Sequence, residues 1–305
     1  MGAIITKALS FLLLIVAGYL FRQFGLIKKE FGVQLAVLSI KLLLPATIMA
    51  SFASFKMDYS ILVLFLFGIL GNLLILLIGF VVSLKRERKD KIYYMVSGNS
   101  YNIGNFALPF VSSFFGPIGI ISTSIFDAGN SIMLLGLNCP FAEMLSGRKE
   151  GQSGYGVSYI MKRLFSAPAF DCYMIMLIFS MLKIQLPAAF FSICSEIGKA
   201  NGPVAMFMIG AMLEIHFDKR YLKMTAAMLL IRFSVAATLM LIISRFSFLP
   251  EDARIAGMII VWAPIGSASA ANTALLGGDT ALSAFVNTIS LIMSLIIIPV
   301  LVMVL

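Results

Sequence analysis

Residues 61–84 read ILVLFLFGILGNLLILLIGFVVSL, a run without a single charged side chain. About 20 apolar residues are enough for a helix to cross the hydrocarbon core of a bilayer. Backbone N–H and C=O groups find no water there, so a spanning segment must be a helix or a strand of a closed barrel. Barrel strands alternate apolar and polar residues with a period of two, and this run does not. It therefore predicts a transmembrane helix.

Similar apolar runs recur along the rest of the chain. Only 12% of the 305 residues are charged and 60% are hydrophobic, whereas a soluble domain carries about 25% charged residues. Turn residues and charges divide the chain into ten predicted helical spans, at residues 4–24, 31–55, 60–84, 92–115, 117–145, 168–184, 188–213, 222–244, 253–276 and 280–304. The sequence therefore predicts an all-α integral membrane protein with ten transmembrane helices, embedded in a lipid bilayer.

Most of the positively charged residues lie in the loops between the predicted spans. The net charge is +9, and the loops after the first, third, fifth and seventh spans hold 15 Lys and Arg residues, against five on the opposite side. Because basic loops face the cytoplasm, we predict a multi-pass protein of the cell inner (cytoplasmic) membrane with both termini outside. Basic residues confined to short loops also argue against nucleic acid as a partner, which requires a basic patch on one face.

The longest polar stretch lies in the middle of the chain. It divides the sequence into a first repeat, residues 1–146, a cytoplasmic linker, residues 147–157, and a second repeat, residues 158–305. Each repeat holds five predicted helices, and this odd number makes the second repeat insert upside down relative to the first. We therefore predict a 5+5 inverted repeat.

The fourth helix of each repeat has a polar centre interrupted by Gly or Pro. Residues 97–105 read SGNSYNIGN, and residues 264–273 read PIGSASAANT. Gly and Pro weaken the helical hydrogen-bond ladder, and interrupted helices at matching positions of two halves are the best sequence indication of a transport site. The N-termini of half-helices carry a partial positive charge, which suits the carboxylate of a small organic anion.

Amide side chains in these two centres are the predicted substrate ligands. Buried amides need hydrogen-bond partners, and a cavity lined by substrate or water supplies them. For the small residues alone, the alternative is close helix packing. The residues predicted to bind substrate are Asn99, Asn102, Asn105, Pro109, Pro264 and Asn272.

Charged and amide side chains also lie deep inside predicted spans, at Lys41, Asp127, Asn130 and Arg232. A charge at mid-bilayer costs about 2.5–3.5 kcal/mol, so each charge should face the interior and have a partner. Lys41 either neutralises Asp127 across the bundle or attracts an anionic substrate. Asp127, with Asn130 nearly one turn later, is either a permanently paired acid or a proton-coupling group, because a carboxylate in a low dielectric binds a proton more readily. Arg232 either takes part in charge pairing or anchors its helix to carbonyls of a neighbour.

Other reactive residues receive structural roles. Glu196 lies three residues before Lys199 on one helical face, which predicts an ion pair. The cysteines, Cys139, Cys172 and Cys194, are far apart in apolar surroundings and fit neither a disulfide framework nor a metal cluster. We therefore predict no metal site.

Four motifs, in this order along the chain, resemble the auxin efflux carrier family, which includes plant auxin carriers and bacterial malate and malonate permeases. The first is the interrupted centre of the fourth helix, and the others lie in the second half. They are Gly98-Asn99 with Gly104 and Leu108-Pro109; Arg163 to Pro168; Ile184 to Pro187 with Pro203 and Met208-Ile-Gly210; and Ala263-Pro264 with Ala271-Asn272 and Gly278-Asp279.

This resemblance covers nearly the whole chain and implies a ten-helix inverted repeat in which helices 4 and 9 cross. It also implies a scaffold domain, movement of the elevator type and a small organic anion as substrate. A homodimer is compatible with it. The short central loop is of the bacterial style rather than that of the plant carriers.

The predicted function is that of a secondary active transporter for a small organic anion such as a dicarboxylate. It would have no cofactor beyond a coupling ion, H⁺ or Na⁺. The alternative within transport is a sodium-coupled symporter of the bile-acid transporter type. An intramembrane enzyme is disfavoured, because the sequence has no HExxH motif and no nucleophile elbow; we predict no catalytic residues.

Overall fold

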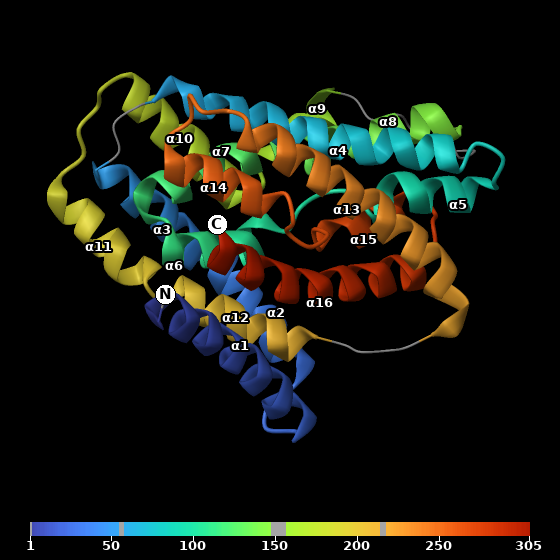
Figure 1. The fold of residues 1–305 in the computed structure, drawn as a ribbon, viewed down its shortest axis with the longest axis horizontal. Helices are drawn as coiled ribbons and strands as arrows, with labels where there is room; N and C mark the ends of the chain where they lie inside the picture. Colours follow the sequence, from blue (N-terminus) through green and yellow to red (C-terminus); the bar gives the residue numbers. More distant parts are fainter. Residues whose placement is uncertain (1, 55–57, 148–156, 214–217) are drawn as a thin grey trace.

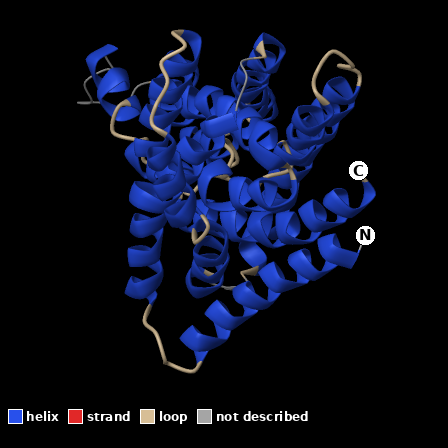
Figure 2. Ribbon diagram, turned by 90° about the vertical axis from the view of Figure 1, so that its left-hand side faces the viewer, coloured by secondary structure: helices blue, strands red, loops and turns tan. Residues whose placement is uncertain are grey.

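The computed structural model describes residues 2–54, 58–147, 157–213 and 218–305. All regular elements in these ranges are helices, packed side by side around buried apolar residues (Figures 1 and 2). The predicted all-α class is thereby confirmed. The predicted linker falls almost entirely outside the described residues.

Five helices are long and apolar enough to cross a membrane, and each matches a predicted span. Two of them contain a π-helical segment, where the backbone is locally wider than an α-helix. The five are Lys29–Ser51 (α2, Lys29–Leu38, and α3, Leu44–Ser51), Tyr59–Val82 (α4, Val63–Val82), Gly116–Ser146 (α7, Gly116–Ser131, and α8, Asn138–Ser146), Lys219–Ser244 (α13, Leu222–Ser244) and Thr280–Val304 (α16).

The other five predicted spans are shorter, bent or interrupted in the structure. The first is α1 (Gly2–Gln23), whose apolar part runs over Leu9–Gln23. The sixth is α10 (Pro168–Met181), which meets α9 (Val157–Leu164) at an angle of 85°; this bent pair is a further candidate span. The remaining three are each divided into two short helical pieces. In the fourth, α5 (Arg88–Ile92) continues into a π-helical segment, Tyr93–Ser97, and a second π-helical segment, Ile103–Ala107, continues into α6 (Leu108–Phe114). The seventh consists of α11 (Ala188–Gly198) and α12 (Asn201–Met212), and the ninth of α14 (Glu251–Ile260) and α15 (Ala268–Leu275).

Pairs of glycines bring two sets of helices into close contact. A Cβ atom at Gly68 of α4 would lie 2.2 Å from the carbonyl oxygen of Phe126 in α7. Where α1 packs on α12, a Cβ at Gly18 would lie 2.1 Å from the carbonyl oxygen of Phe207. Small residues of this kind let helix backbones approach closely within a membrane. α4 and α7 form one tightly packed pair, and α1 and α12 form another (Figure 1).

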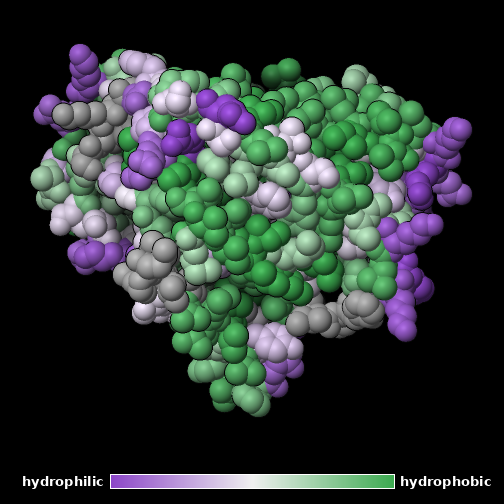
Figure 3. Space-filling view, in the orientation of Figure 1, coloured by the Kyte–Doolittle hydropathy of each residue, from purple (hydrophilic) through white to green (hydrophobic). Residues whose placement is uncertain are grey.

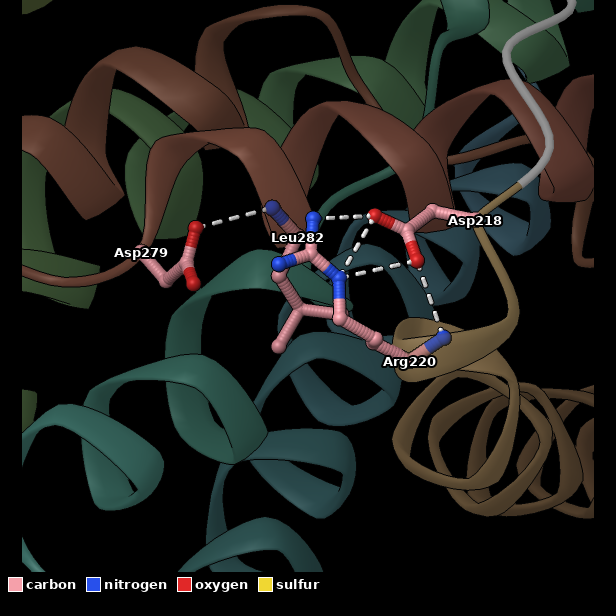
Figure 4. Close-up of polar contacts among 4 residues, drawn as sticks. All are labelled: Asp218, Arg220, Asp279 and Leu282. Atoms are coloured by element: carbon pink, nitrogen blue, oxygen red, sulfur yellow. Dashed lines mark hydrogen bonds and ion pairs between the residues drawn. The ribbon is translucent and has the colours of Figure 1, made fainter.

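Aspartates cap the starts of three long spans. Asp58 and Asp218 each accept a hydrogen bond from the backbone N–H two residues later, at 2.9 Å. Asp279 accepts one from the backbone N–H of Leu282 at the start of α16 (Figure 4). The side chain of Arg220 also pairs with Asp218 (Figure 4) and holds the pKa of that carboxyl below its usual value. These caps satisfy N–H groups that have no partner within the helix.

The surface agrees with a membrane environment. In Figure 3, hydrophobic residues cover the middle of the visible face, and hydrophilic residues gather mainly toward its left and right edges. The right-hand edge lies near one end of each of α4, α13 and α16, which run across the view (Figure 1). Large apolar side chains such as Leu66, Leu230 and Ile296 are at least 60% exposed. Exposed apolar area of this kind is explained by contact with lipid.

Candidate substrate site at two helix breaks

Two helices are interrupted, and their breaks touch. Helical hydrogen bonding stops after Ser97 and resumes at Ile103, and it stops again after Ile260 and resumes at Ala268. The backbone N–H of Asn102 donates to the carbonyl oxygen of Pro264 at 2.8 Å. More than 160 positions of sequence separate these two residues, so their contact brings the two predicted polar centres together.

Amide side chains hold the first break. Asn130 of α7 accepts from the backbone N–H of Tyr101 and donates to its carbonyl, both at 3.0 Å. Asn72 of α4 accepts from the backbone N–H of Ser100 at 2.7 Å. Both asparagines are buried. Backbone groups of the break that have lost helical hydrogen bonds are therefore paired with side chains, because buried backbone groups need hydrogen-bond partners.

Asn99 is part of the same amide network. Its Nδ2 donates to Oδ1 of Asn138 at 2.7 Å, and its Oδ1 accepts from the backbone N–H of Ser100 at 2.7 Å. Ser100 has a positive φ of 72°, in the left-handed region that non-glycine residues seldom adopt. This conformation breaks the helix, and the side chain of Asn99 stabilises it.

Hydroxyl groups hold the second break. The backbone N–H of Ile265 donates to Oγ of Ser290 at 3.1 Å, and Ser294 donates its hydroxyl to the carbonyl of Trp262 at 2.8 Å. Both serines lie on α16. Pro264 has no N–H to donate, so its place inside the break leaves no orphan donor.

Arg232 of α13 joins the two breaks. Its guanidinium donates to the carbonyl oxygens of Gly98 and Ser100 at 2.8 Å each, and to that of Ala263 at 2.7 Å. The side chain is 1% exposed, and its Cζ lies 4.7 Å from the centre of the Tyr101 ring. Of the two predicted roles, the structure shows the anchoring of neighbouring carbonyls.

Asp127 belongs to this network through Asn130. Asn130 donates to Oδ1 of Asp127 at 2.9 Å, and the hydroxyl of Tyr173 in α10 donates to Oδ2 at 3.0 Å. Lys41 is exposed, and none of the described ion pairs joins it to Asp127. Lys41 lies in the π-helical segment Ser39–Leu43 after α2, on its exposed side, whereas Ser39 and Leu43 of the same segment are buried. The predicted ion pair between Glu196 and Lys199 is confirmed, and it is exposed.

The other predicted ligands are distributed over two places. Asn102 and Asn105 are half-buried next to the first break, and Oδ1 of Asn105 has no hydrogen-bond partner among the described residues. Pro109 is buried in the first turn of α6. Asn272 instead lies in α15, where its Oδ1 accepts two hydrogen bonds from Arg163 of α9, both at 3.1 Å. The structure thus brings Asn102 to Pro264 and brings Asn272 to Arg163.

A cavity of about 520 Å³ lies beside α6 and the start of α7. Two lysines line it, Lys7 and Lys199, together with hydroxyl groups such as those of Thr47 and Ser113. The ammonium of Lys7 donates to the carbonyl of Ser113. A cavity with cationic and hydroxyl groups is suited to a small anion.

The sequence reasoning missed several functional side chains. Asn72 was a detectable signal, because it is a lone amide within the apolar run at residues 61–84. Asn138 contacts Asn99, although the spacing of the sequence gave no sign of this. Ser290 had no distinguishing pattern around it, since a single serine is common in membrane proteins. Arg163 begins one of the four family-like motifs, but the motif did not indicate a contact with Asn272.

Comparison with protein families matches the two halves of the chain separately. The family model described as membrane transport protein, which is of the auxin efflux carrier type, matches residues 3–153. The model of the sodium bile acid symporter family matches residues 202–305. The chain is a membrane transporter, and its first half is of the auxin efflux carrier type. The predicted resemblance is thereby confirmed for residues 3–153, which hold the first of the four motifs. No curated protein sequence matches this transporter.

Proposed function

We propose that this protein is a secondary active transporter of a small organic anion such as a dicarboxylate, and that the substrate binds where the two helix breaks meet. The observation that carries the proposal is the contact between Asn102 and Pro264. Interrupted helices that meet inside a transporter place backbone N–H and C=O groups where a substrate and coupling ions can use them. Asn102 and Asn105 lie half-buried beside this contact and would donate to the anion.

Matched contacts support the ten-helix inverted repeat, with residues 1–146 and 158–305 as its halves. Asp58 and Asp218, which cap two spans in the same way, are 160 residues apart. The same offset separates Asn72 from Arg232 and Asn130 from Ser290. Asn72 and Arg232 both reach from a long span to the backbone of a break, and Asn130 and Ser290 do so from a second span.

The grouping of helices supports alternating access of the elevator type. The tightest packing joins α1 to α12 and α3 to α11 on one side, and α4 to α7 on the other. The cavity with Lys7 and Lys199 lies between these groups, since α1, α3, α11 and α12 contribute to one wall and α6 and α7 to the other. A boundary of this kind is where one group could slide past the other, carrying the breaks with it.

The proposed orientation has both termini outside the cell inner membrane and the basic loops in the cytoplasm. It rests on the asymmetry of Lys and Arg between the two sides. Single cysteines at Ser247 and Lys89 test it with an impermeant thiol reagent in intact cells. Labelling at position 247 and not at 89 is the expected result, and the reverse pattern contradicts the orientation.

Uptake of radiolabelled dicarboxylates into proteoliposomes tests the proposed function. Asn105→Ala should raise the apparent substrate constant at least tenfold, which corresponds to about 1.4 kcal/mol, because a hydrogen bond to a charged group contributes about 1.5–3 kcal/mol. Gln34→Ala, which removes an exposed amide of α2, is the matched control and should leave the constant unchanged. Wild-type affinity in both Asn105→Ala and Asn102→Ala would place the site elsewhere.

The second candidate is a sodium-coupled symporter of the bile-acid transporter type. The match of residues 202–305 to the sodium bile acid symporter family favours it. Uptake driven by an inward Na⁺ gradient, compared with an inward H⁺ gradient at equal substrate, separates the two. Uptake of a dicarboxylate that follows the H⁺ gradient alone would reject this candidate.

A further inference from the structure

The guanidinium of Arg232 lies at a convergence of backbone carbonyls. Gly98 and Ser100 belong to the first break and Ala263 to the second, and their three carbonyl oxygens all accept from Arg232 within 2.8 Å. None of the three belongs to the helix that carries the arginine. Without that side chain, three buried acceptors from two unwound segments would face one another.

Such a convergence is the environment of a bound cation. In transporters with broken helices, unwound carbonyls coordinate the coupling cation, and carbonyl oxygens are ligands for hard cations in general. In this protein the positive charge is covalently attached instead. The face of Tyr101, 4.7 Å away, adds a cation–π contact, which is strongest for a desolvated cation.

We propose that Arg232 is a tethered cation, which takes the place of a dissociable cation at the crossing of the two breaks. The proposal rests on the proposed transport function for its consequence, namely that this crossing needs no Na⁺ to keep its shape.

Within the part of the chain that the structure describes, no carboxylate pairs directly with Arg232. None of the described ion pairs includes it, and its hydrogen bonds go to neutral carbonyls. A net positive charge in a low-dielectric interior attracts an anion over several ångströms. Arg232 is therefore a positioning residue that holds both breaks and also makes the crossing favourable for an anionic substrate.

Two substitutions separate a tethered cation from a simple hydrogen-bonding anchor. Arg232→Lys keeps the charge and changes the donors, whereas Arg232→Gln keeps two amide donors and removes the charge. We expect uptake within about threefold of wild type for Arg232→Lys and a loss of at least tenfold for Arg232→Gln. Equal uptake in the two variants, or a better Arg232→Gln, would overturn the proposal.

Chemical rescue provides a readout that needs no substrate. Purified Arg232→Ala should unfold at a lower temperature than wild type, and millimolar guanidinium should restore at least half of the loss. Urea, a neutral molecule of similar shape, is the control and should restore none of it. Equal effects of guanidinium and urea would overturn the tethered cation, while rescue of folding without any dicarboxylate uptake by wild type would reject only the proposed transport function. If Arg232→Ala cannot be purified, the comparison of the Lys and Gln variants decides.

Discussion

In both helix breaks, backbone groups lack helical hydrogen-bond partners, and a different kind of side chain supplies new partners at each break. At the first break, Asn130 pairs with both the N–H and the C=O of Tyr101. Asn72 accepts from the N–H of Ser100 and donates to the carbonyl of Gly68 in its own helix. At the second break, Ser290 and Ser294 each make one contact with the backbone of the break or of the residue just before it. The arginine that completes the second break also reaches the first.

Under the proposed inverted repeat, this difference would make the crossing selective for charge. Position 72 carries a neutral amide and position 232, its counterpart in the proposal, carries a positive charge, although both reach a break from the middle of a long apolar span. Two identical halves would give a crossing with no net charge preference. One arginine in place of the amide would make the proposed site suited to an anion.

The largest effect should come from Asn130, whose amide both accepts from and donates to the backbone of the first break. Asn130→Ala leaves the N–H and C=O of Tyr101 unpaired, and it also removes the donor to Asp127. A buried group without a partner costs about 1–3 kcal/mol, so we expect a loss of about 2–5 kcal/mol in unfolding free energy, measured by urea titration in micelles. Asn287→Ala is the matched control, because Asn287 is a half-buried asparagine of a long span that offers Ser290 only its backbone carbonyl. A loss below 1 kcal/mol in Asn130→Ala would contradict the role of this amide in holding the first break.

The smallest effect should come from the matched position in the second half. Ser290→Ala removes the acceptor for the N–H of Ile265, and this single neutral hydrogen bond should be worth about 1 kcal/mol. The same titration measures it beside Asn130→Ala. If Ser290→Ala is as damaging as Asn130→Ala, the two breaks are equivalent and the contrast between them is lost.

The sequence predicted the helix breaks well because Gly, Pro and clustered amides act locally on the backbone. The polar centre at residues 97–105 contains the first break, and the second break, at residues 261–267, overlaps the start of the polar centre at 264–273. The anchoring role of Arg232 was one of two options that burial of a charge leaves open. The five continuous spans were also predictable, since an apolar run of sufficient length has few other uses.

The remaining features depend on side-chain direction, which periodicity does not determine. Lys41 lies deep in a predicted span of the sequence, yet its side chain is on the exposed side of the helix. Asn272 was grouped with Asn102 and Asn105 by its place in an interrupted helix, but its partner, Arg163, comes from α9, a short amphipathic helix within a predicted loop. The contact depends on the 85° bend between α9 and α10. The angle of such a bend cannot be predicted from the sequence.

The hydrogen bonds from Arg232 to Gly98 and Ser100 also constrain the order in which the two breaks can form during membrane insertion. The first break is synthesised more than 130 residues before the arginine that satisfies its carbonyls. During insertion, those carbonyls must therefore be held by water or by the translocation machinery until α13 arrives. The amides of Asn72 and Asn130 come from nearby spans and are available early, so the N–H groups of the break are satisfied first. The nascent first half can thus enter the membrane with its break partly formed, and the arrival of one side chain from the second half completes it.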